Sequence, residues 1–519
     1  MKVNFFMKLG IVLFLIGISF GPLLARDLNF STPADAESLD PAAAGTMEAL
    51  IGIEPFYETL VSLKGMTTDL APSLATSWEV SKDGMAITFN LRKGVKFHDG
   101  TELTAEDVRY TYERLLKTSL NSAAKTLGTC TNPQKIFAVD KYTFKMELSR
   151  VNPLVFGVLT SPFCSIVNKA YVAKYSTEGD PYGLNWMRNH PMGTGPWKFE
   201  KWLVNQRLSM TKNEDYWGGK AHFDRMNINV ISDPAAAQMM LEKGELDIAT
   251  RLRMDQYTTL EKSKDVDVKS FSTLKTVTLR INCGGKPFDD VRVRQALNYA
   301  INYNEIIKVV EQGKAIRNYS ALPNNLWGKN HDVKPKYEFD PEKAKSLLKE
   351  AGLEKGFEAR LYYSPARYAP FEDMVPLLES YFRKIGIQIK PQKLAYTTQQ
   401  AKMYNRDYDL ALDTWIPYFP DPREVIHKHY HSEAWKTKVW SWSFWENPTA
   451  DKLITEAENT MDHHEREWRY QRVDQIGVEN AVYAHLYQTQ ETMAMRKNIK
   501  NVVWHPTLQF KGFASISAE

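Results

Sequence analysis

The stretch that decides the fold is WEVSKDGMAITFNLRKGVKFHDGTELTAEDVR, residues 78–109. It predicts a β-hairpin, because apolar residues alternate on both sides of Asp83-Gly84, a dipeptide that favours tight hairpin turns. The alternation continues in a further strand at 95–97, and Asp99-Gly100 turns the chain again. The residues TAED at 104–107 have the pattern of a capping box, so a helix is expected to begin there. The apolar positions of the hairpin are Trp78, Val80, Ile87, Phe89 and Leu91.

The first 25 residues have the features of an export signal. Lys2 and Lys8 form a basic start, and residues 9–20 form an apolar run that is too short to span a bilayer. Ala25 precedes the expected cleavage site, and no Cys follows it, so a lipid anchor is not expected. A retained anchor helix is the alternative interpretation. The sequence therefore predicts an exported protein, most simply a soluble periplasmic one.

Composition bears on the class of partner. The net charge of the 519 residues is +4, and removing Lys2 and Lys8 with the leader leaves +2. That charge is too balanced to indicate nucleic acid or an anionic membrane. The roughly 490 residues that remain can bury several cores, so two or three domains are expected. Aromatic residues make up 12% of the chain, which fits an ordinary core or a pocket that grips flat ligands.

Strand and helix signals alternate along the chain, which predicts α/β layers. Helices are expected after Asp233-Pro234, Asp289-Asp290 and Asp340-Pro341, because Asp is a favoured residue just before a helix and Pro at its first position. Strands are expected at 226–231, 268–281, 358–363, 387–390 and 408–412.

Three cysteines remain after export, namely Cys130, Cys164 and Cys283. Cys130 and Cys164 are 34 residues apart in one expected subdomain. An oxidising compartment favours a disulfide between them, and free thiols are the alternative. No Cys-x-x-Cys occurs, so the cysteines give no metal or redox motif.

Two clusters of ring side chains each allow a structural and a functional interpretation. His427, His429 and His431 alternate in HKHYH; on a strand they would share one side and could bind a transition metal. In a helix or loop they would instead belong to the protein surface. The second cluster is formed by Trp440, Trp442 and Trp445 in the segment VWSWSFWEN. These tryptophans belong either to the protein core or to a wall on which a sugar or ring ligand stacks. The structural interpretation is favoured in both cases, so we expect no metal site.

A series of later motifs follows the opening stretch. They are HPMGTGPW at 190–197, NEDYW at 213–217, LDI at 246–248, DDVRVRQAL at 289–297, DYD at 407–409 and WIPYFPDP at 415–422. In this order, the series resembles the large solute-binding proteins of ABC importers, the oligopeptide, dipeptide and nickel-binding type known as extracellular solute-binding protein family 5. The resemblance covers essentially the whole mature chain.

The resemblance implies an α/β two-lobed periplasmic binding protein fold, class II-like and of cluster C, whose lobes are joined by a two-strand hinge. Residues 26–282 and 488–519 would form lobe one, with an extra subdomain at about 55–189, and residues 283–487 would form lobe two. Such a protein captures a small or medium solute, peptide-like or other, and delivers it to ABC transporter permease subunits in the inner membrane. We expect a monomer with no catalytic residue, cofactor, metal or nucleic acid.

The loop at 415–422 matters most for the ligand, because it follows a strand and carries aromatic residues. The resemblance implies that Trp415, Tyr418 and Phe419 form the wall of lobe two. The other expected contacts are two residues of lobe one, one residue that lies five to six positions before Glu372 and Asp373, and two residues at the hinge: Met47, Leu50, Arg367, Tyr487 and Gln488.

Charged positions of this loop depart from the peptide-binding members of the family. Those members carry an Asp three residues after the Trp, which pairs with the ligand's ammonium group, and some carry an Arg three residues before it. This chain has Tyr418 and Leu412 there. Where dipeptide binders place a further carboxylate-binding Arg, it has Glu372 or Asp373, and Arg367 is a candidate substitute. A buried charge without its partner is costly, so we expect a ligand that lacks those charges.

Two other functions stay open at this point. An exported carbohydrate-active hydrolase would need paired carboxylates, but no pair stands out by its spacing, and neither Gly-x-Ser-x-Gly nor His-Glu-x-x-His occurs. A ligand-sensing partner of a membrane receptor would share the same fold. A turnover assay tests the first alternative, and permease genes beside this gene would argue against the second.

Overall fold

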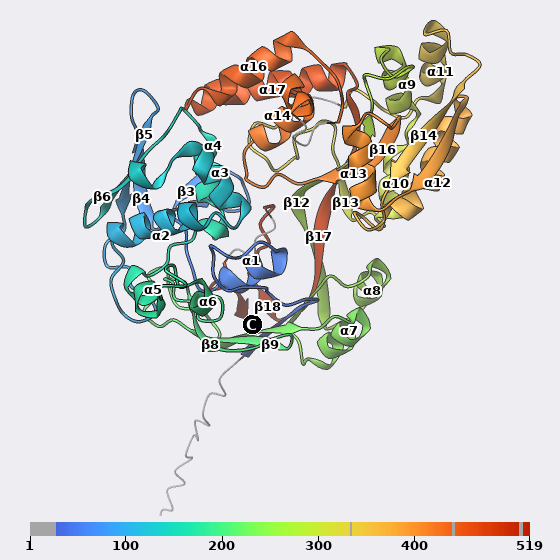
Figure 1. Ribbon diagram of the computed structural model, residues 1–519. Coiled ribbons are helices and arrows are strands. Elements are labelled where there is room, and N and C mark those ends of the chain that lie inside the picture. The colour runs from blue at the N-terminus through green and yellow to red at the C-terminus, as the bar shows by residue number, and fades with distance from the viewer. Residues whose placement is uncertain (1–26, 333–334, 438–441, 508–511) are drawn as a thin grey trace, which may run out of the picture.

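Two bodies make up the molecule, and two long strands connect them. The computed structural model describes residues 27–332, 335–437, 442–507 and 512–519. Figure 1 shows lobe one below and to the left, lobe two above and to the right, and β12 (Val266–Ile281) and β17 (Tyr483–Arg496) between them. The expected leader lies outside the described residues. Within the described part of the chain, no helix combines the length and apolar character needed to cross a membrane.

One large mixed sheet runs through both lobes. Its strand order is β15-β14-β16-β12-β17-β11-β1-β10-β9-β8, and β13 also pairs with β17. The five expected strands are confirmed, each within a few residues of its predicted bounds. The bounds of the strands other than β12 and β17 are β1 (Asp27–Thr32), β8 (Trp197–Leu203), β9 (Arg207–Lys212), β10 (Arg225–Val230), β11 (Ile248–Thr250), β13 (Ala315–Arg317), β14 (Phe357–Tyr363), β15 (Ile387–Lys393) and β16 (Leu410–Trp415).

The two connecting strands belong to both lobes. Residues 276–281 of β12 pair with β16 in lobe two, whereas residues 266–272 pair with the part of β17 that continues towards β11 in lobe one. The register shifts between Ser272 and Thr276, and at this place the hydroxyl oxygens of Thr273 and Thr489 lie 2.8 Å apart. An irregularity of this kind bends a strand locally. The lobe boundaries near 282 and 487 stay a proposal.

The opening stretch forms the predicted hairpin in the extra subdomain. Trp78 pairs with Phe89 across β4 and β5, and Gly84 turns the chain with a φ of +70°. Val80 departs from the expected buried face, because 37% of its surface is exposed. The expected strand at 95–97 is wrong: only an isolated bridge between Lys96 and Glu102 forms there. The subdomain sheet has the order β4-β5-β7-β6, with bounds β4 (Ala75–Val80), β5 (Ala86–Leu91), β6 (Ile136–Asp140) and β7 (Thr143–Glu147).

Helix starts follow the predicted caps. In α2 (Ala105–Thr118), the carboxylate of Asp107 accepts the backbone N–H of Thr104 at 2.9 Å, as in a capping box. The carboxylate of Asp233 likewise accepts the N–H of Ala235 at 2.8 Å, and Gly244 ends that helix with a φ of +81°. The helices that begin after the three predicted Asp caps are α7 (Pro234–Lys243), α9 (Val291–Ala300) and α11 (Pro341–Glu350).

The remaining elements divide between the lobes. Lobe one also contains β2 (Val61–Leu63), β3 (Leu70–Pro72), α1 (Met47–Ile53), α3 (Ser122–Cys130), η1 (Pro133–Lys135), α4 (Leu154–Leu159), η2 (Pro162–Cys164), α5 (Lys169–Tyr175), α6 (Leu184–Met187), α8 (Met254–Leu260), β18 (Ile499–Lys500) and β19 (Ser517–Ala518). Lobe two contains α10 (Tyr303–Val310), α12 (Phe371–Lys384), α13 (Tyr396–Tyr404), α14 (Arg423–Tyr430), α15 (Ser432–Lys436), α16 (Pro448–Glu458) and α17 (His463–Glu479).

The cysteines differ from the expected disulfide. All three are free thiols. Cys130 and Cys164 do share the core of the extra subdomain, but the sulfur of Cys130 accepts a hydrogen bond from Asn152 Nδ2 at 3.1 Å. Burial raises the pKa of both thiols, so both stay protonated at neutral pH. The expectation of a bridge between Cys130 and Cys164 is therefore wrong for this structure.

Both ring clusters are explained by the fold. The segment HKHYH lies in α14 and just after it, so the three histidines do not alternate along a strand. The rings of His427 and His431 stack, with 4.8 Å between their centres, as expected for residues four apart on a helix. His429 is buried, and its ring forms a hydrogen bond with the carbonyl oxygen of Val425. No metal-binding group of His, Cys, Asp and Glu is found among the described residues. Trp442 and Trp445 are buried in lobe-two cores, and Trp440 lies outside the described residues.

Candidate functional site

The loops of lobe two that face the connecting strands follow three parallel strands. β14 pairs in parallel with both β15 and β16, so the carboxyl ends of all three strands lie at one edge of the sheet. Arg367 follows β14, Tyr396 follows β15 and Tyr418 follows β16. In open α/β sheets, ligands bind outside the carboxyl ends of the strands. This edge is therefore the place where a ligand of lobe two is expected.

The three aromatic residues of the loop at 415–422 have different surroundings. Tyr418 is 52% exposed, whereas Trp415 and Phe419 are buried. The rings of Trp415 and Tyr418 meet edge to face, with 6.2 Å between their centres. Phe419 packs into the core of the extra subdomain of lobe one, next to Gly157. Of the predicted aromatic wall, Tyr418 alone offers an exposed ring in this structure, and the ligand role of all three residues stays a prediction.

A buried ion pair fixes this loop. The guanidinium of Arg466 in α17 donates to both carboxylate oxygens of Asp421, at 2.7 and 2.9 Å. Both side chains are almost fully buried, at 5% and 4% exposure. Trp327 adds a hydrogen bond from its indole nitrogen to the carbonyl of Pro420 at 3.0 Å. The loop is thus held from two directions, which keeps Tyr418 in place at its tip.

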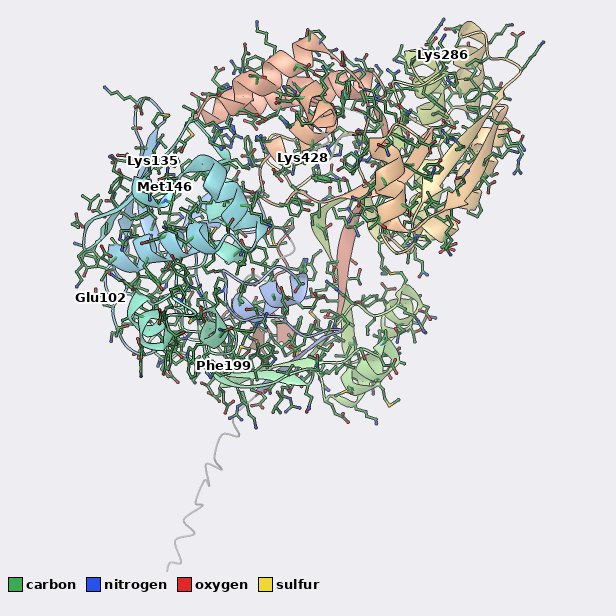
Figure 2. The ribbon with its side chains drawn as sticks, viewed as in Figure 1. Glu102, Lys135, Met146, Phe199, Lys286 and Lys428 are labelled. Carbon is green, nitrogen blue, oxygen red and sulfur yellow. The ribbon has the colours of Figure 1, made fainter. Side chains whose placement is uncertain are left out.

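Two cations lie beside Tyr418. Arg367 donates to the carbonyl of Thr414 at 2.7 Å, and its guanidinium stands 4.8 Å from the ring centre of Tyr396. Lys428 lies 5.0 Å from the ring centre of Trp415 and forms an ion pair with Glu424 at 2.8 Å. Figure 2 shows Lys428 on the side of lobe two that is turned towards lobe one. Arg367 keeps 29% of its side chain exposed.

The side chains of the two predicted hinge residues, Tyr487 and Gln488, are buried and form hydrogen bonds within the protein. The hydroxyl of Tyr487 donates to the carboxylate of Glu311 at 2.6 Å. The side chain of Gln488 accepts the backbone N–H of Asn324 at 2.7 Å and also contacts the side chain of Asn325. Both residues are completely buried. Gln488 thus ties the segment 324–325 to β17, and Tyr487 ties Glu311 to it. A direct contact of either residue with a ligand stays a prediction.

Lobe one contributes α1 to the same region. Figure 1 places this helix on the side of lobe one that faces lobe two. Met47 is its first residue, and nothing is described of the Met47 side chain. Leu50 is half-buried against the lobe-one core. Glu48 forms an ion pair with Arg251 at 2.9 Å, which fixes the exposed face of α1.

Sequence reasoning missed Lys275 and Tyr396. Lys275 lies in the irregular part of β12, and its ammonium stands 4.3 Å from the ring centre of Tyr368. The hydroxyl of Tyr396 is buried and lacks a hydrogen-bond partner among the described residues. A sequence signal existed for Lys275, because it is a single charge within the apolar strand LKTVTL. Nothing in the sequence marks Tyr396.

A cavity of about 370 Å³ lies where the extra subdomain meets lobe two. Its lining from lobe one includes Trp78 and Phe156, and its lining from lobe two includes Trp327 and His463. The rings of Trp327 and His463 are 4.3 Å apart. Near this cavity the lobes also touch through a hydrogen bond from the N–H of Trp327 to Thr68 Oγ1 at 2.8 Å. Both lobes therefore line this cavity, in addition to sharing the large sheet.

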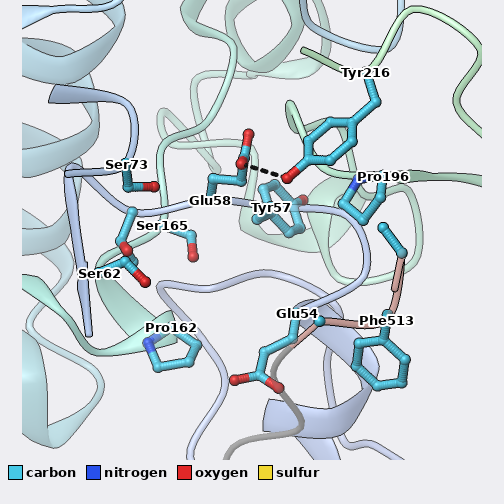
Figure 3. A pocket seen from close by; sticks show the side chains of 13 residues that line it. Glu54, Tyr57, Glu58, Ser62, Ser73, Pro162, Ser165, Pro196, Tyr216 and Phe513 are labelled. Atoms are coloured by element: carbon cyan, nitrogen blue, oxygen red, sulfur yellow. Dashed lines mark hydrogen bonds between the residues drawn. The ribbon is translucent and has the colours of Figure 1, made fainter. Parts of the chain in front are cut away.

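A smaller cavity of about 160 Å³ lies within lobe one around Glu58 (Figure 3). The carboxylate of Glu58 accepts hydrogen bonds from Thr194, Tyr216 and Trp217 at 2.8 to 2.9 Å. Burial raises the pKa of Glu58 to about 7. The motifs at 190–197 and 213–217 therefore both donate hydrogen bonds to the Glu58 carboxylate, which gives the two motifs a structural role.

Comparison with known proteins agrees with this architecture. The family model of bacterial extracellular solute-binding proteins, family 5 Middle, matches residues 69–437. The probable D,D-dipeptide-binding periplasmic protein DdpA of Escherichia coli is 30% identical, over 92% of this chain and 91% of that protein.

Solved structures show the same fold. The periplasmic binding protein DppA of Helicobacter pylori, in complex with the peptide STSA, is 28% identical with a TM-score of 0.71, over 95% of this chain and 98% of that one. The murein tripeptide-binding protein MppA, in an unliganded open form, is 22% identical with a TM-score of 0.83, over the same shares. The chain therefore belongs to the bacterial extracellular solute-binding proteins of family 5, which hold a solute for an ABC importer.

Proposed function

We propose that the protein captures one small or medium solute between its two lobes in the periplasm and hands it, as a monomer, to permease subunits in the inner membrane. The observation that carries this proposal is the position of the site. Figure 1 places α1 on the side of lobe one that is turned towards lobe two, with β12 and β17 between the lobes. The loops after β14, β15 and β16 lie at one edge of the sheet in lobe two. A ligand held there contacts both lobes and favours their closed arrangement.

The connecting strands support a hinge movement. Their ladder is irregular at residues 272–276, whereas it is regular on the lobe-one side of that segment. The TM-score is higher against an unliganded open form, at 0.83, than against a peptide complex, at 0.71. This difference supports an open arrangement in the present structure, which would close on the ligand. A closed surface recognised by the permease would couple binding to delivery.

The charged positions of the site support a ligand other than an ordinary peptide with free ends. Leu412 has no hydrogen-bond donor in its side chain and is completely buried in β16. Glu372 is itself a carboxylate, paired with Lys393, so neither residue could bind a carboxylate of the ligand. Tyr418 can donate or accept a hydrogen bond but cannot neutralise an ammonium group. Relatives are named for dipeptides. A peptide ligand of this chain would therefore need a blocked or absent free amine at Tyr418.

Native mass spectrometry of protein purified from the periplasm without denaturation tests the proposed function. We expect one ligand per protein chain, and calorimetry with the identified compound should give saturable binding without turnover. Conversion of the compound into product would instead favour the hydrolase. A protein that binds nothing in the periplasmic extract and in a peptide and glycan library would contradict the proposal.

A further inference from the structure

The cavity of about 370 Å³ between the extra subdomain and lobe two is lined by residues other than those expected to bind the solute. Trp78 of β4 and Phe156 of α4 line it from lobe one, and Trp327 lines it from lobe two. Among the described residues, its lining does not include Tyr418 or Arg367. Ligand pockets usually have volumes of about 300–1,000 Å³, so this cavity is large enough for a small molecule of its own.

Four ring side chains that line this cavity are not fully buried. The rings of Trp78 and Phe156 have 6.2 Å between their centres and are tilted by 44°, and both are only partly buried against the core of the extra subdomain. Trp327 is likewise partly buried in lobe two, and His463 is exposed. Aromatic surface in contact with water is unfavourable, and aromatic rings pack well on one another. The lining therefore favours a ligand with a flat aromatic ring.

Trp327 is held in place by three neighbours. Its indole N–H donates to the carbonyl oxygen of Pro420 at 3.0 Å. The ring of His463 lies 4.3 Å from the ring of Trp327, centre to centre, and the guanidinium of Arg466 stands 5.0 Å from the Trp327 ring centre. A side chain that its neighbours already fix loses little conformational freedom when a ligand binds. Trp327 is therefore suited to form the rigid wall of a binding site.

The buried charges in the lining neutralise each other. Arg466 and Asp421 both line the cavity and form a buried ion pair at 2.7 Å. Asp69 also lines the cavity, but it is exposed to solvent. Burying an ionised group without a partner is costly. A ligand without charge therefore fits this cavity better than an anion or a cation does.

Direct contacts join the two lobes beside the cavity. The backbone N–H of Trp327 donates to Thr68 Oγ1 at 2.8 Å, and both residues line the cavity. At the turn of the β4–β5 hairpin, a Cβ atom placed on Gly84 would lie 3.3 Å from the Cγ of Met461, which is another lining residue of lobe two. A ring bound in the cavity would therefore add to an existing contact between the lobes.

We propose that this cavity is a second ligand site, which takes an uncharged flat aromatic ring and, when occupied, holds the extra subdomain against lobe two. The inference goes beyond the proposed function, because the solute is expected beside Tyr418. The loop at 415–422 connects the two sites, since Tyr418 belongs to one and Pro420 and Asp421 line the other. A bound ring favours the arrangement of the lobes in which the cavity exists, so it acts on the same lobe movement as the solute.

Indole is the probe for this site, and ¹⁹F NMR of protein labelled with fluorotryptophan is the measurement. The signals of Trp78 and Trp327 are assigned as those lost in Trp78→Phe and Trp327→Phe. We expect both signals to shift saturably with indole and with the same affinity, because one ring contacts both lobes. The signal of Trp468, which is 40% exposed on α17, should not shift. No shift of Trp78 and Trp327, or equal shifts of all three signals, would overturn the inference.

Val80→Phe fills the cavity without removing any ring from its lining. Val80 lines the cavity from β4 and is 37% exposed, so a larger side chain has room there. We expect this change to weaken the indole affinity at least tenfold. Val139→Phe is the matched control, because Val139 is 59% exposed on β6, the other edge strand of the same sheet, and does not line the cavity. Equal affinities in the two variants would contradict binding in the cavity.

Two comparisons separate a ring site from general apolar binding and from the solute site. Cyclohexanol, which has no aromatic face, should bind at least several-fold more weakly than indole, and equal binding would overturn the choice of ligand class. Tyr418→Ala should leave the indole affinity of the Trp78 and Trp327 signals unchanged. Loss of that affinity in Tyr418→Ala would show that the cavity belongs to the solute site and would overturn a second site.

Hydrogen exchange measured by mass spectrometry tests the effect on the lobes. The backbone N–H of Trp327 donates across the contact to Thr68, so its exchange reports on that contact. We expect saturating indole to slow this exchange at least several-fold, and Val80→Phe to remove the effect of indole. Unchanged exchange at Trp327, with the ¹⁹F signals of Trp78 and Trp327 at saturation, would contradict a ring that holds the two lobes together.

Discussion

At the scale of single residues, the aromatic side chains of the loop at 415–422 differ in what they can offer a ligand. Trp415 and Phe419 are buried, at 4% and 3% exposure, whereas Tyr418 is 52% exposed beside the guanidinium of Arg367. A ring exposed at the end of a strand can stack on a flat ligand face at little cost in conformational freedom. Tyr418 is therefore the residue of the loop whose loss should affect binding without affecting folding.

Replacing Tyr418 by Ala should weaken binding of the co-purified ligand roughly tenfold or more, which corresponds to about 1.4 kcal/mol. Calorimetry at constant pH measures this change. Tyr418→Phe is the control, because it keeps the ring and removes only the hydroxyl. Affinity that is unchanged in Tyr418→Ala would remove Tyr418 from the site.

Thiol counting tests the state of the cysteines. Protein denatured without reductant should show three reactive thiols, because Cys130, Cys164 and Cys283 are all free in the structure. A count of one would restore the disulfide between Cys130 and Cys164. Mass spectrometry of the alkylated protein would identify which residues reacted.

At the scale of elements, the loop at 415–422 depends on a contact outside its own sequence. Asp421 and Arg466 are 45 residues apart and form a buried pair with two hydrogen bonds. Removing one partner of such a pair leaves a charge buried without compensation. The position of Tyr418 is therefore set by α17 as much as by β16.

Arg466→Met should lower the free energy of unfolding by about 3–5 kcal/mol, because it leaves the Asp421 carboxylate buried and unpaired. Arg225→Met is the matched control, since Arg225 forms a similar two-bond pair with Glu200 on the exposed surface. That change should have little effect on stability. Equal losses in urea denaturation of the two variants would contradict this explanation.

Local patterns predicted the elements well, and long-range contacts explain what they missed. Asp-Pro caps and the Asp83-Gly84 turn act within a few residues, so α7, α11 and the β4–β5 hairpin follow from sequence. HKHYH is equally compatible with a strand or a helix when read alone. Phe419 is buried by residues of the extra subdomain, and Lys275 lies over Tyr368 of lobe two. Both sets of partners are distant in the sequence, so no local pattern records these contacts.

At the scale of the whole molecule, function depends on two lobes that share one sheet. β12 and β17 carry the sheet through both bodies, and their pairing shifts register at residues 272–276 and again between Val277 and Thr278. The cavity of about 370 Å³ between the extra subdomain and lobe two would change its volume when the lobes move. Ligand contacts on both sides of the hinge would stabilise the closed arrangement relative to the open one.

Solution X-ray scattering with and without saturating co-purified ligand tests closure most directly. We predict a smaller radius of gyration for the ligand-bound protein, because the lobes approach one another around β12 and β17. Tyr418→Ala at the same ligand concentration should show an intermediate value, since fewer molecules hold the ligand. An unchanged radius of gyration, with calorimetry confirming that the site is occupied, would contradict capture by closure of the two lobes.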